Sequence, residues 1–140
     1  MSELLTGFYT SNEVILSKTE VLADYQLVCE SRAVSLMGRK DVFMGRAKFG
    51  IFGDGKELAQ IALSKVFRKG DFRSGYYRDQ TLVAATGGLT WQQFFAQLYA
   101  HADINHDIFT AGRSMNAHYG NHWLDEKGHC LDQTEMFNGA

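Results

Sequence analysis

The feature that most constrains the fold is a run of apolar residues at steps of three and four that begins after Ser17. This spacing places side chains on one face of an α-helix. The run comprises Val21, Tyr25, Val28, Cys29, Ala33, Leu36 and Met37. Ser17 and Glu20 form a capping-box pattern before it, and Gly38 with Arg39-Lys40 is typical of a helix end. The pattern predicts an amphipathic helix over 19–38 with this apolar face in the core.

A second helix is predicted over 55–69. Asp54 and Glu57 mark its start, and Gly70 is expected to end it. Residues 41–53, between the two helices, are apolar but interrupted by glycines. They fit either a short strand or a buried loop.

Two shorter helices follow, over 79–85 and 91–100. Gly87-Gly88 ends the first, and Thr90 with Gln93 repeats the capping-box pattern before the second. The expected class is therefore mostly α, with about four helices and little strand.

Composition excludes several classes of protein. Apolar residues make up 45% of the 140 residues and the net charge is −2, so neither nucleic acid nor an anionic membrane is expected as the partner. The N-terminus carries Glu3 and no basic segment, so it does not resemble a secretory signal. Two cysteines form no disulfide framework, and Cys29 is expected to be an inert core residue. A cytoplasmic location follows as the expectation.

The segment Arg73-Ser74-Gly75-Tyr76-Tyr77-Arg78-Asp79 is the first candidate site. Arginine offers a planar fork of donors to a phosphate, and tyrosine hydroxyls add directional donors. The segment therefore suits a small anion. The alternative is a surface turn with a salt-bridged arginine and a half-buried pair of tyrosines.

Two patterns suggest metal ligands, and both are set aside. Gly53-Asp54-Gly55 matches part of the metal–diphosphate signature of thiamine enzymes, but no asparagine follows at the required spacing and the triplet opens a helix. His118 and His122 are four residues apart, as in helical zinc sites, but Gly120 separates them and no acidic base follows. No metal is assigned to these residues, nor to the nearby His129 and Cys130. His101 and His106 are expected to be exposed.

The segment 112–120, with sequence GRSMNAHYG, is the second candidate site. It combines arginine, histidine and tyrosine between glycines. A histidine can transfer protons near neutral pH, although loops of this composition also occur as plain turns.

The chain resembles the α-type subunit of thiamine-diphosphate-dependent, branched-chain 2-oxo acid dehydrogenases, particularly bacterial forms in which α- and β-type halves are fused. The resemblance runs from Leu22 to about Tyr119. It is carried by ESRAVSLMGRKDVFMGRAKFGIFGDGKELAQIALSKVFRKGDFRSGYYRDQT, by LTWQQFFAQLYAHAD and by GRSMNAHYG. It implies that 17–120 form the helical N-terminal segment of an α/β thiamine-diphosphate-binding fold, incomplete without its parallel sheet. Residues 1–16 are expected to be a loose lead-in, and 121–140 an irregular tail.

The resemblance also implies roles for individual residues. Tyr77 and Arg78 match the pair that grips the cofactor diphosphate, and Tyr76 lies beside them. Tyr77, Met115 and His118 are implied at the substrate, together with Phe49. Ser114 and Asn116 replace the family's usual Gln and Pro, which leaves the substrate preference open.

The family's chemistry is oxidative decarboxylation of a branched-chain 2-oxo acid, followed by acyl transfer to a lipoyl group. The magnesium ligands of that family have no counterpart in this chain. The implied partners are a β-type half of the same enzyme, a lipoyl-bearing transacylase core and a small 2-oxo acid. A fragment or split subunit, inactive alone, is the expectation.

The alternative is a non-enzymatic helical interaction module. Its partner face would be the aromatic helix that carries Trp91, Phe94, Phe95, Leu98 and Tyr99. An aromatic run of this kind is more often core than interface. Binding of thiamine diphosphate distinguishes the two functions.

Overall fold

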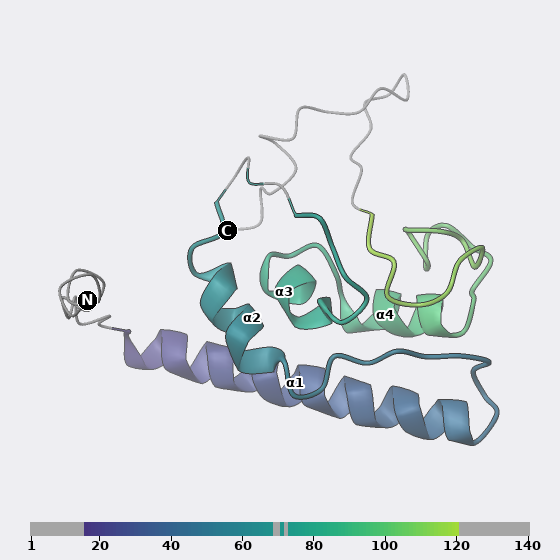
Figure 1. Ribbon diagram of the computed structural model, residues 1–140, viewed down its shortest axis with the longest axis horizontal. Helices are drawn as coiled ribbons and strands as arrows, with labels where there is room; N and C mark the ends of the chain where they lie inside the picture. The colour runs from purple at the N-terminus through teal and green to yellow at the C-terminus, as the bar shows by residue number, and fades with distance from the viewer. Residues whose placement is uncertain (1–15, 69–70, 72, 121–140) are drawn as a thin grey trace, which may run out of the picture.

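The computed structural model describes residues 16–68, 71 and 73–120. Within them lie four helices and no strand: α1 (Lys18–Phe43), α2 (Glu57–Ser64), α3 (Gln80–Ala85) and α4 (Trp91–Leu98). The long α1 runs along one side of the molecule, and the other three helices lie together on the same side of it (Figure 1). None of these helices is long and apolar enough to cross a membrane. The predictions for Gly70, for the lead-in before residue 16 and for the tail 121–140 fall outside the described residues.

The start of α1 is confirmed, but its end is not. The Glu20 amide donates to Ser17 Oγ over 3.2 Å, and Glu20 Oε2 accepts from the Ser17 amide over 2.9 Å, which completes the capping box. The helix continues past Gly38 and ends before Gly45, whose φ of 72° suits a glycine at the end of a helix.

Gly38 is a packing position inside α1. A Cβ atom there would lie 3.0 Å from Phe52 Cζ and 3.2 Å from Leu98 Cδ2. The missing side chain therefore lets the loop after α1 and helix α4 approach the helix closely. A glycine selected for close approach looks the same in a sequence as a glycine that ends a helix.

The predicted core face of α1 is wrong. The buried residues are Ser31, Val34, Ser35, Gly38 and Asp41, which are mostly small or polar. Of the predicted face, only Val28 is partly buried. The other six members, Cys29 included, are exposed. The reason is that the elements packed against α1 offer polar groups, so the helix turns its polar side toward them.

The remaining helices occur where they were expected, with shorter bounds. The helix predicted over 55–69 is α2, which begins at Glu57 without a side-chain cap. The last two correspond to α3 and α4, and α4 has the expected capping box of Thr90 and Gln93. Of the segment 41–53, residues 41–43 form the end of α1, and 44–53 leave it as a loop without a strand.

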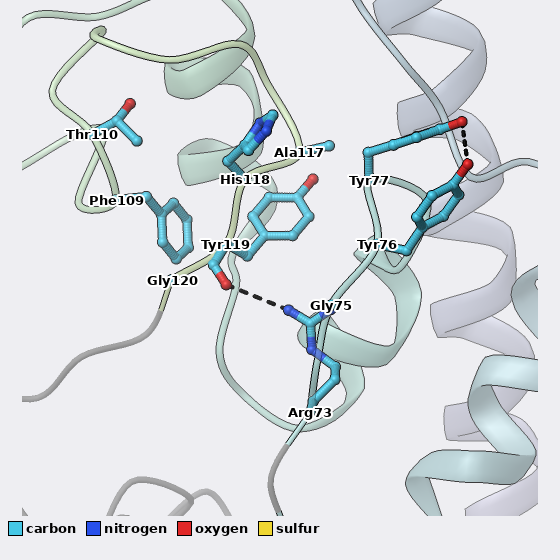
Figure 2. A pocket seen from close by; sticks show the side chains of 10 residues that line it. All are labelled: Arg73, Gly75, Tyr76, Tyr77, Phe109, Thr110, Ala117, His118, Tyr119 and Gly120. Atoms are coloured by element: carbon cyan, nitrogen blue, oxygen red, sulfur yellow. Dashed lines mark hydrogen bonds between the residues drawn. The ribbon is translucent and has the colours of Figure 1, made fainter.

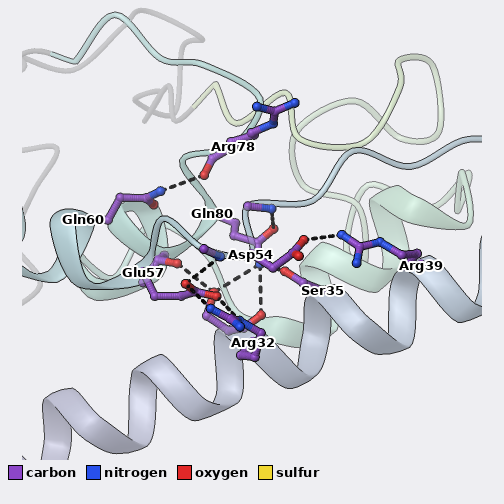
Figure 3. A network of polar contacts seen from close by, with 12 residues as sticks. Arg32, Ser35, Arg39, Asp54, Glu57, Gln60, Arg78 and Gln80 are labelled. Carbon is purple, nitrogen blue, oxygen red and sulfur yellow. Dashed lines mark hydrogen bonds and ion pairs between the residues drawn. The ribbon is translucent and has the colours of Figure 1, made fainter.

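A buried polar network holds α3 against α1 (Figure 3). Gln80 is 0% exposed, and its Nε2 donates to Ser35 Oγ over 2.9 Å and to Ser31 O and Oγ over 3.2 Å. Its Oε1 accepts from the Gly53 amide over 3.2 Å. The hydroxyls of Ser31 and Thr81 are 2.7 Å apart. One glutamine thus joins α1, α3 and the loop before α2.

The apolar core is centred on Phe94, which is 0% exposed. Its buried neighbours come from α1, α3, the turn between α3 and α4, α4 and the second candidate loop, namely Val34, Val83, Leu89, Leu98, Ala117 and Tyr119. The aromatic helix of the alternative function is therefore largely core at Phe94 and Leu98. Trp91 is partly buried and donates from Nε1 to Glu30 Oε2 over 2.8 Å.

An ion pair joins α1 to the start of α2. Glu57 is 3% exposed, and its two carboxylate oxygens accept from Arg32 Nε and Nη2 over 2.6 and 2.9 Å. Glu57 Oε2 also accepts from the Gly55 amide over 2.8 Å. The hydrogen bonds from Arg32 outweigh burial and hold the pKa of Glu57 below its ordinary value of 4.5.

We expect this pair to make stability depend on pH. Because the folded-state pKa of Glu57 is lowered, its contribution is present above about pH 4.5 and is lost as the pH falls through the folded-state value. Glu57→Gln should cost about 1–2 kcal/mol of unfolding free energy at neutral pH, since Arg32 is partly solvated. The cost should shrink in acid. Urea unfolding of both proteins across this range checks it, and a difference that stays constant with pH would contradict it.

Candidate functional site

The two candidate loops meet at one pocket of about 540 Å³. Its lining combines Arg73, Gly75, Tyr76 and Tyr77 from the first loop with Phe109, Thr110, Ala117, His118, Tyr119 and Gly120 from the second region. Figure 2 shows the tyrosine pair on one side of the pocket, with His118 and Tyr119 facing it. The volume lies in the range of small-molecule sites.

The first loop is tied down by Asp79. Asp79 Oδ2 accepts from Arg73 Nη1 over 2.7 Å and from the Tyr76 amide over 2.7 Å. The positive charge of Arg73 is therefore balanced inside the protein. The hydroxyls of Tyr76 and Tyr77 bond to each other, and this bond raises the pKa of Tyr76. The Tyr76 hydroxyl is therefore the donor in this bond, and the Tyr77 hydroxyl accepts it and keeps its own O–H for another acceptor.

Arg78 is exposed, and its guanidinium lies over the Tyr77 ring, 5.2 Å from the ring centroid. It takes part in none of the ion pairs of the described residues. Its backbone is fixed, because the carbonyl accepts from Gln60 Nε2 over 2.8 Å. A Cβ on Gly53 would lie 2.6 Å from this carbonyl, so the chain can pass there only with a glycine. Arg78 does not line the pocket, but it places a positive charge on a fixed backbone beside Tyr77, which does.

The second loop is held from both sides. Asn116 is 3% exposed and bonds through its side-chain amide to the Ile51 backbone, over 3.2 Å to N and 3.1 Å to O. The side-chain amide of Gln97 likewise bonds to the His118 backbone, accepting from N over 3.2 Å and donating to O over 2.9 Å. Between them Ala117 has a φ of 66°, in the left-handed region that a non-glycine residue rarely adopts. These clamps set the direction of the His118 side chain.

His118 is exposed at the pocket, and its Nδ1 lies 3.0 Å from the Met115 carbonyl. A carbonyl only accepts, so Nδ1 carries the hydrogen and the neutral ring has its acceptor at Nε2. Met115 and Phe49, the other residues implied at the substrate, are 53% and 47% exposed and do not line the pocket. The structure brings Tyr76, Tyr77 and His118 together, with Arg78 adjoining, and their roles stay predictions.

The residues considered as metal ligands have other contacts. Asp54 pairs with Arg39 over 2.5 Å. His101 and His106 are exposed, as expected, with ring centroids 4.5 Å apart at the edge of a second, aromatic pocket beside α4. No group of three metal-ligating side chains occurs in the described part of the chain. His122, His129 and Cys130 lie outside it.

Tyr119 is the tyrosine of the second candidate segment, and it lines the pocket with its hydroxyl buried. Its side chain is 9% exposed, and its hydroxyl is the buried side-chain polar atom without a partner among the residues described. Burial raises the pKa of Tyr119, so the hydroxyl remains protonated. Figure 2 shows this hydroxyl pointing toward the side of the pocket formed by Tyr77. A buried donor without an acceptor indicates a place where a ligand or water atom completes the structure.

Tyr119→Phe should stabilise the chain. The substitution keeps the ring and removes an unpaired hydroxyl, for a gain of about 0.5–1.5 kcal/mol. The matched control is Tyr99→Phe, because the Tyr99 hydroxyl bonds to Asp41 and its loss should be unfavourable. Thermal unfolding should move in opposite directions for the two variants. A lower melting temperature for Tyr119→Phe would mean that its hydroxyl has a partner in the folded protein.

No family model, curated protein sequence or solved structure matches this chain.

Proposed function

We propose that the pocket between the two loops is part of the active site of a thiamine-diphosphate-dependent 2-oxo acid dehydrogenase, in its decarboxylase component. In this proposal the chain supplies the diphosphate contacts Tyr76, Tyr77 and Arg78. The β-type half, the magnesium ligands and the lipoyl-bearing core belong to other parts of the enzyme. The substrate class is a branched-chain 2-oxo acid.

The observation that carries the proposal is the meeting of the two loops. They are separated by about 35 residues in the sequence, and each has a composition that suits binding or proton transfer on its own. The pocket joins Tyr77 to His118, and the orphaned Tyr119 hydroxyl lies in its wall. A plain surface turn would not be expected to pack against the loop of His118, which the side-chain amides of Asn116 and Gln97 hold in place.

The residues present fit a diphosphate. Arg73 is neutralised by Asp79, whereas Arg78 takes part in no ion pair of the described residues, so the loop retains one available positive charge. The Tyr77 hydroxyl, which accepts the Tyr76 proton, adds a neutral donor beside it. Such charge-assisted hydrogen bonds are each worth about 1.5–3 kcal/mol.

Tyr77 and His118 face the space where the 2-oxo acid would lie. The His118 Nε2 acceptor can receive or return a proton there. Thiamine diphosphate, when bound, supplies the electron sink that makes loss of carbon dioxide possible. The aromatic rings of Phe109 and Tyr119 would shield the site from water.

The test is a titration of the chain with thiamine diphosphate, inorganic diphosphate and thiamine at fixed magnesium, followed by amide chemical shifts. We expect both diphosphates to shift the amides of Tyr76, Tyr77 and Arg78, because the loop recognises the anion. Thiamine without its phosphates should leave them unchanged. The non-enzymatic alternative predicts no specific shift with any of the three, and that result would remove the proposal.

The chain alone is expected to be inactive as a decarboxylase, because it lacks the β-type half and the magnesium ligands. Release of carbon dioxide from 4-methyl-2-oxopentanoate should not exceed the rate without protein. Catalytic release by the purified chain would show that it does not need the β-type half or the magnesium ligands, and would contradict the proposal.

A further inference from the structure

The side of α1 that faces away from the body carries an apolar stripe. Its members are Leu22, Tyr25, Cys29, Ala33, Leu36 and Phe43, called the outer stripe below. At about 100° per residue, this stripe lies opposite the buried residues Ser31, Val34 and Gly38. In Figure 1 the other helices lie on one side of α1 only.

The large apolar members of the stripe are all strongly exposed and lie next to one another along the helix. Leu22 is 56% exposed, Tyr25 67%, Leu36 53% and Phe43 83%. Contiguous apolar surface of this kind marks an interaction site. The described core is already closed over the opposite side of the helix, so covering the stripe needs a surface from outside it.

The members of the stripe are spaced roughly symmetrically about its centre. Ala33 lies at the centre, Cys29 and Leu36 on either side of it, and Leu22 and Phe43 at the ends. We propose that the outer stripe is the contact surface between two copies of this chain, with their α1 helices packed antiparallel. The small Ala33 then lies at the two-fold axis, where two helices approach most closely. Leu36 of one copy meets Cys29 of the other, and Phe43 meets Leu22.

Charge favours the antiparallel arrangement over a parallel one. A parallel pair would place Lys18 against Lys18 and Lys40 against Lys40. Reversing one helix separates these pairs and brings Lys40 beside Tyr25 of the second copy, where a cation–π contact is favourable. The helix dipoles also oppose each other favourably in this arrangement.

The available area suits a dimer that forms reversibly. The stripe from Leu22 to Phe43 extends for roughly 32 Å at 1.5 Å per residue. Tyr25 and Phe43 alone expose on the order of 300 Å² per copy, since an aromatic side chain carries roughly 150–250 Å². The full stripe on both copies reaches roughly the 1,000 Å² that a specific interface needs.

Sedimentation velocity over a range of micromolar concentrations tests the proposal with the full chain. The mass should approach about twice the 15.7 kDa of one chain. Leu36→Lys should return it to a single chain without loss of helical circular dichroism, since Leu36 is exposed. The matched control is Leu58→Lys, at a 75% exposed leucine of α2 outside the stripe, which should still dimerise. A single-chain mass at every concentration, a larger assembly, or dimers in Leu36→Lys would overturn the proposal.

Disulfide formation tests the direction of packing. Leu36→Cys in a Cys130→Ser background places position 36 of one copy beside Cys29 of the other. Within one helix these positions are roughly 10 Å apart, too far for a bond, so only a dimer can be cross-linked. Mild oxidation should give a covalent dimer with this variant and little with Cys130→Ser alone. Equally fast cross-linking of Cys130→Ser would indicate a parallel pair and reject the antiparallel one.

Discussion

Gln80→Leu should cost about 3–5 kcal/mol of unfolding free energy, because it leaves several buried polar groups without partners. Gln80 is 0% exposed and bonds to Ser31, Ser35 and the Gly53 amide. Leucine has a similar volume but offers none of these bonds, and water cannot replace them. The loss is a large share of the roughly 5–15 kcal/mol that stabilises a typical domain. Chemical denaturation followed by circular dichroism measures it.

The control for this variant is Gln92→Leu, at an exposed position of α4. It makes the same chemical change without removing a buried network, so its effect should stay within about 0.5 kcal/mol. A loss below about 1 kcal/mol for Gln80→Leu would mean that the network adds little beyond packing. Gln80 accepts a hydrogen bond from the Gly53 amide, and Gly53 lies directly against the Arg78 carbonyl. Gln80→Leu should therefore also change the amide chemical shifts of the loop that contains Arg78.

Local signals in the sequence were sufficient for most helix positions. The capping boxes at Ser17 and Thr90 depend on residues three apart, so their pattern predicts their geometry directly. The end of α1 and the identity of its buried face depend on residues far along the chain. Gln80 reaches residues 45 and 49 positions away, and its polar groups decide which side of α1 is buried. Apolar periodicity shows that a helix has an apolar face, but not whether its own domain covers that face.

The candidate site shows the same division. The sequence was sufficient to predict the chemistry of each loop, because arginine, tyrosine and histidine between glycines suit anion binding and proton transfer. Their meeting at one pocket depends on Asn116 and Gln97, whose side chains bond to distant backbone. Tyr119 stands out because its buried hydroxyl has no hydrogen-bond partner among the described residues. The spacing of residues in the sequence does not predict this. In the sequence, Asn116 is only a departure from the pattern of the family it resembles, whereas in the structure it anchors the second loop.

Arg78→Ala should weaken binding of thiamine diphosphate by about ten-fold or more, since 1.4 kcal/mol corresponds to one decade. Arg78 takes part in none of the described ion pairs, so its charge is available, and its backbone is fixed by Gln60. Because the side chain is exposed and lies over the Tyr77 ring, the substitution should leave the melting temperature nearly unchanged. The loss of affinity would then belong to the ligand contact rather than to unfolding.

Three further variants separate charge, geometry and ring packing at this loop. Arg78→Lys should recover only part of the affinity, because lysine keeps the charge but loses the planar fork. Tyr77→Phe should do less harm than Arg78→Ala, since it removes a neutral hydroxyl and keeps the ring under Arg78. Arg68→Ala, at an exposed arginine after α2, is the control for a general loss of positive charge and should bind as the unmodified chain does. Calorimetric titration at fixed magnesium ranks the four. Equal weakening by Arg68→Ala and Arg78→Ala would point to a diffuse attraction by net charge, and unchanged binding in Arg78→Ala would reduce the loop to an ordinary turn.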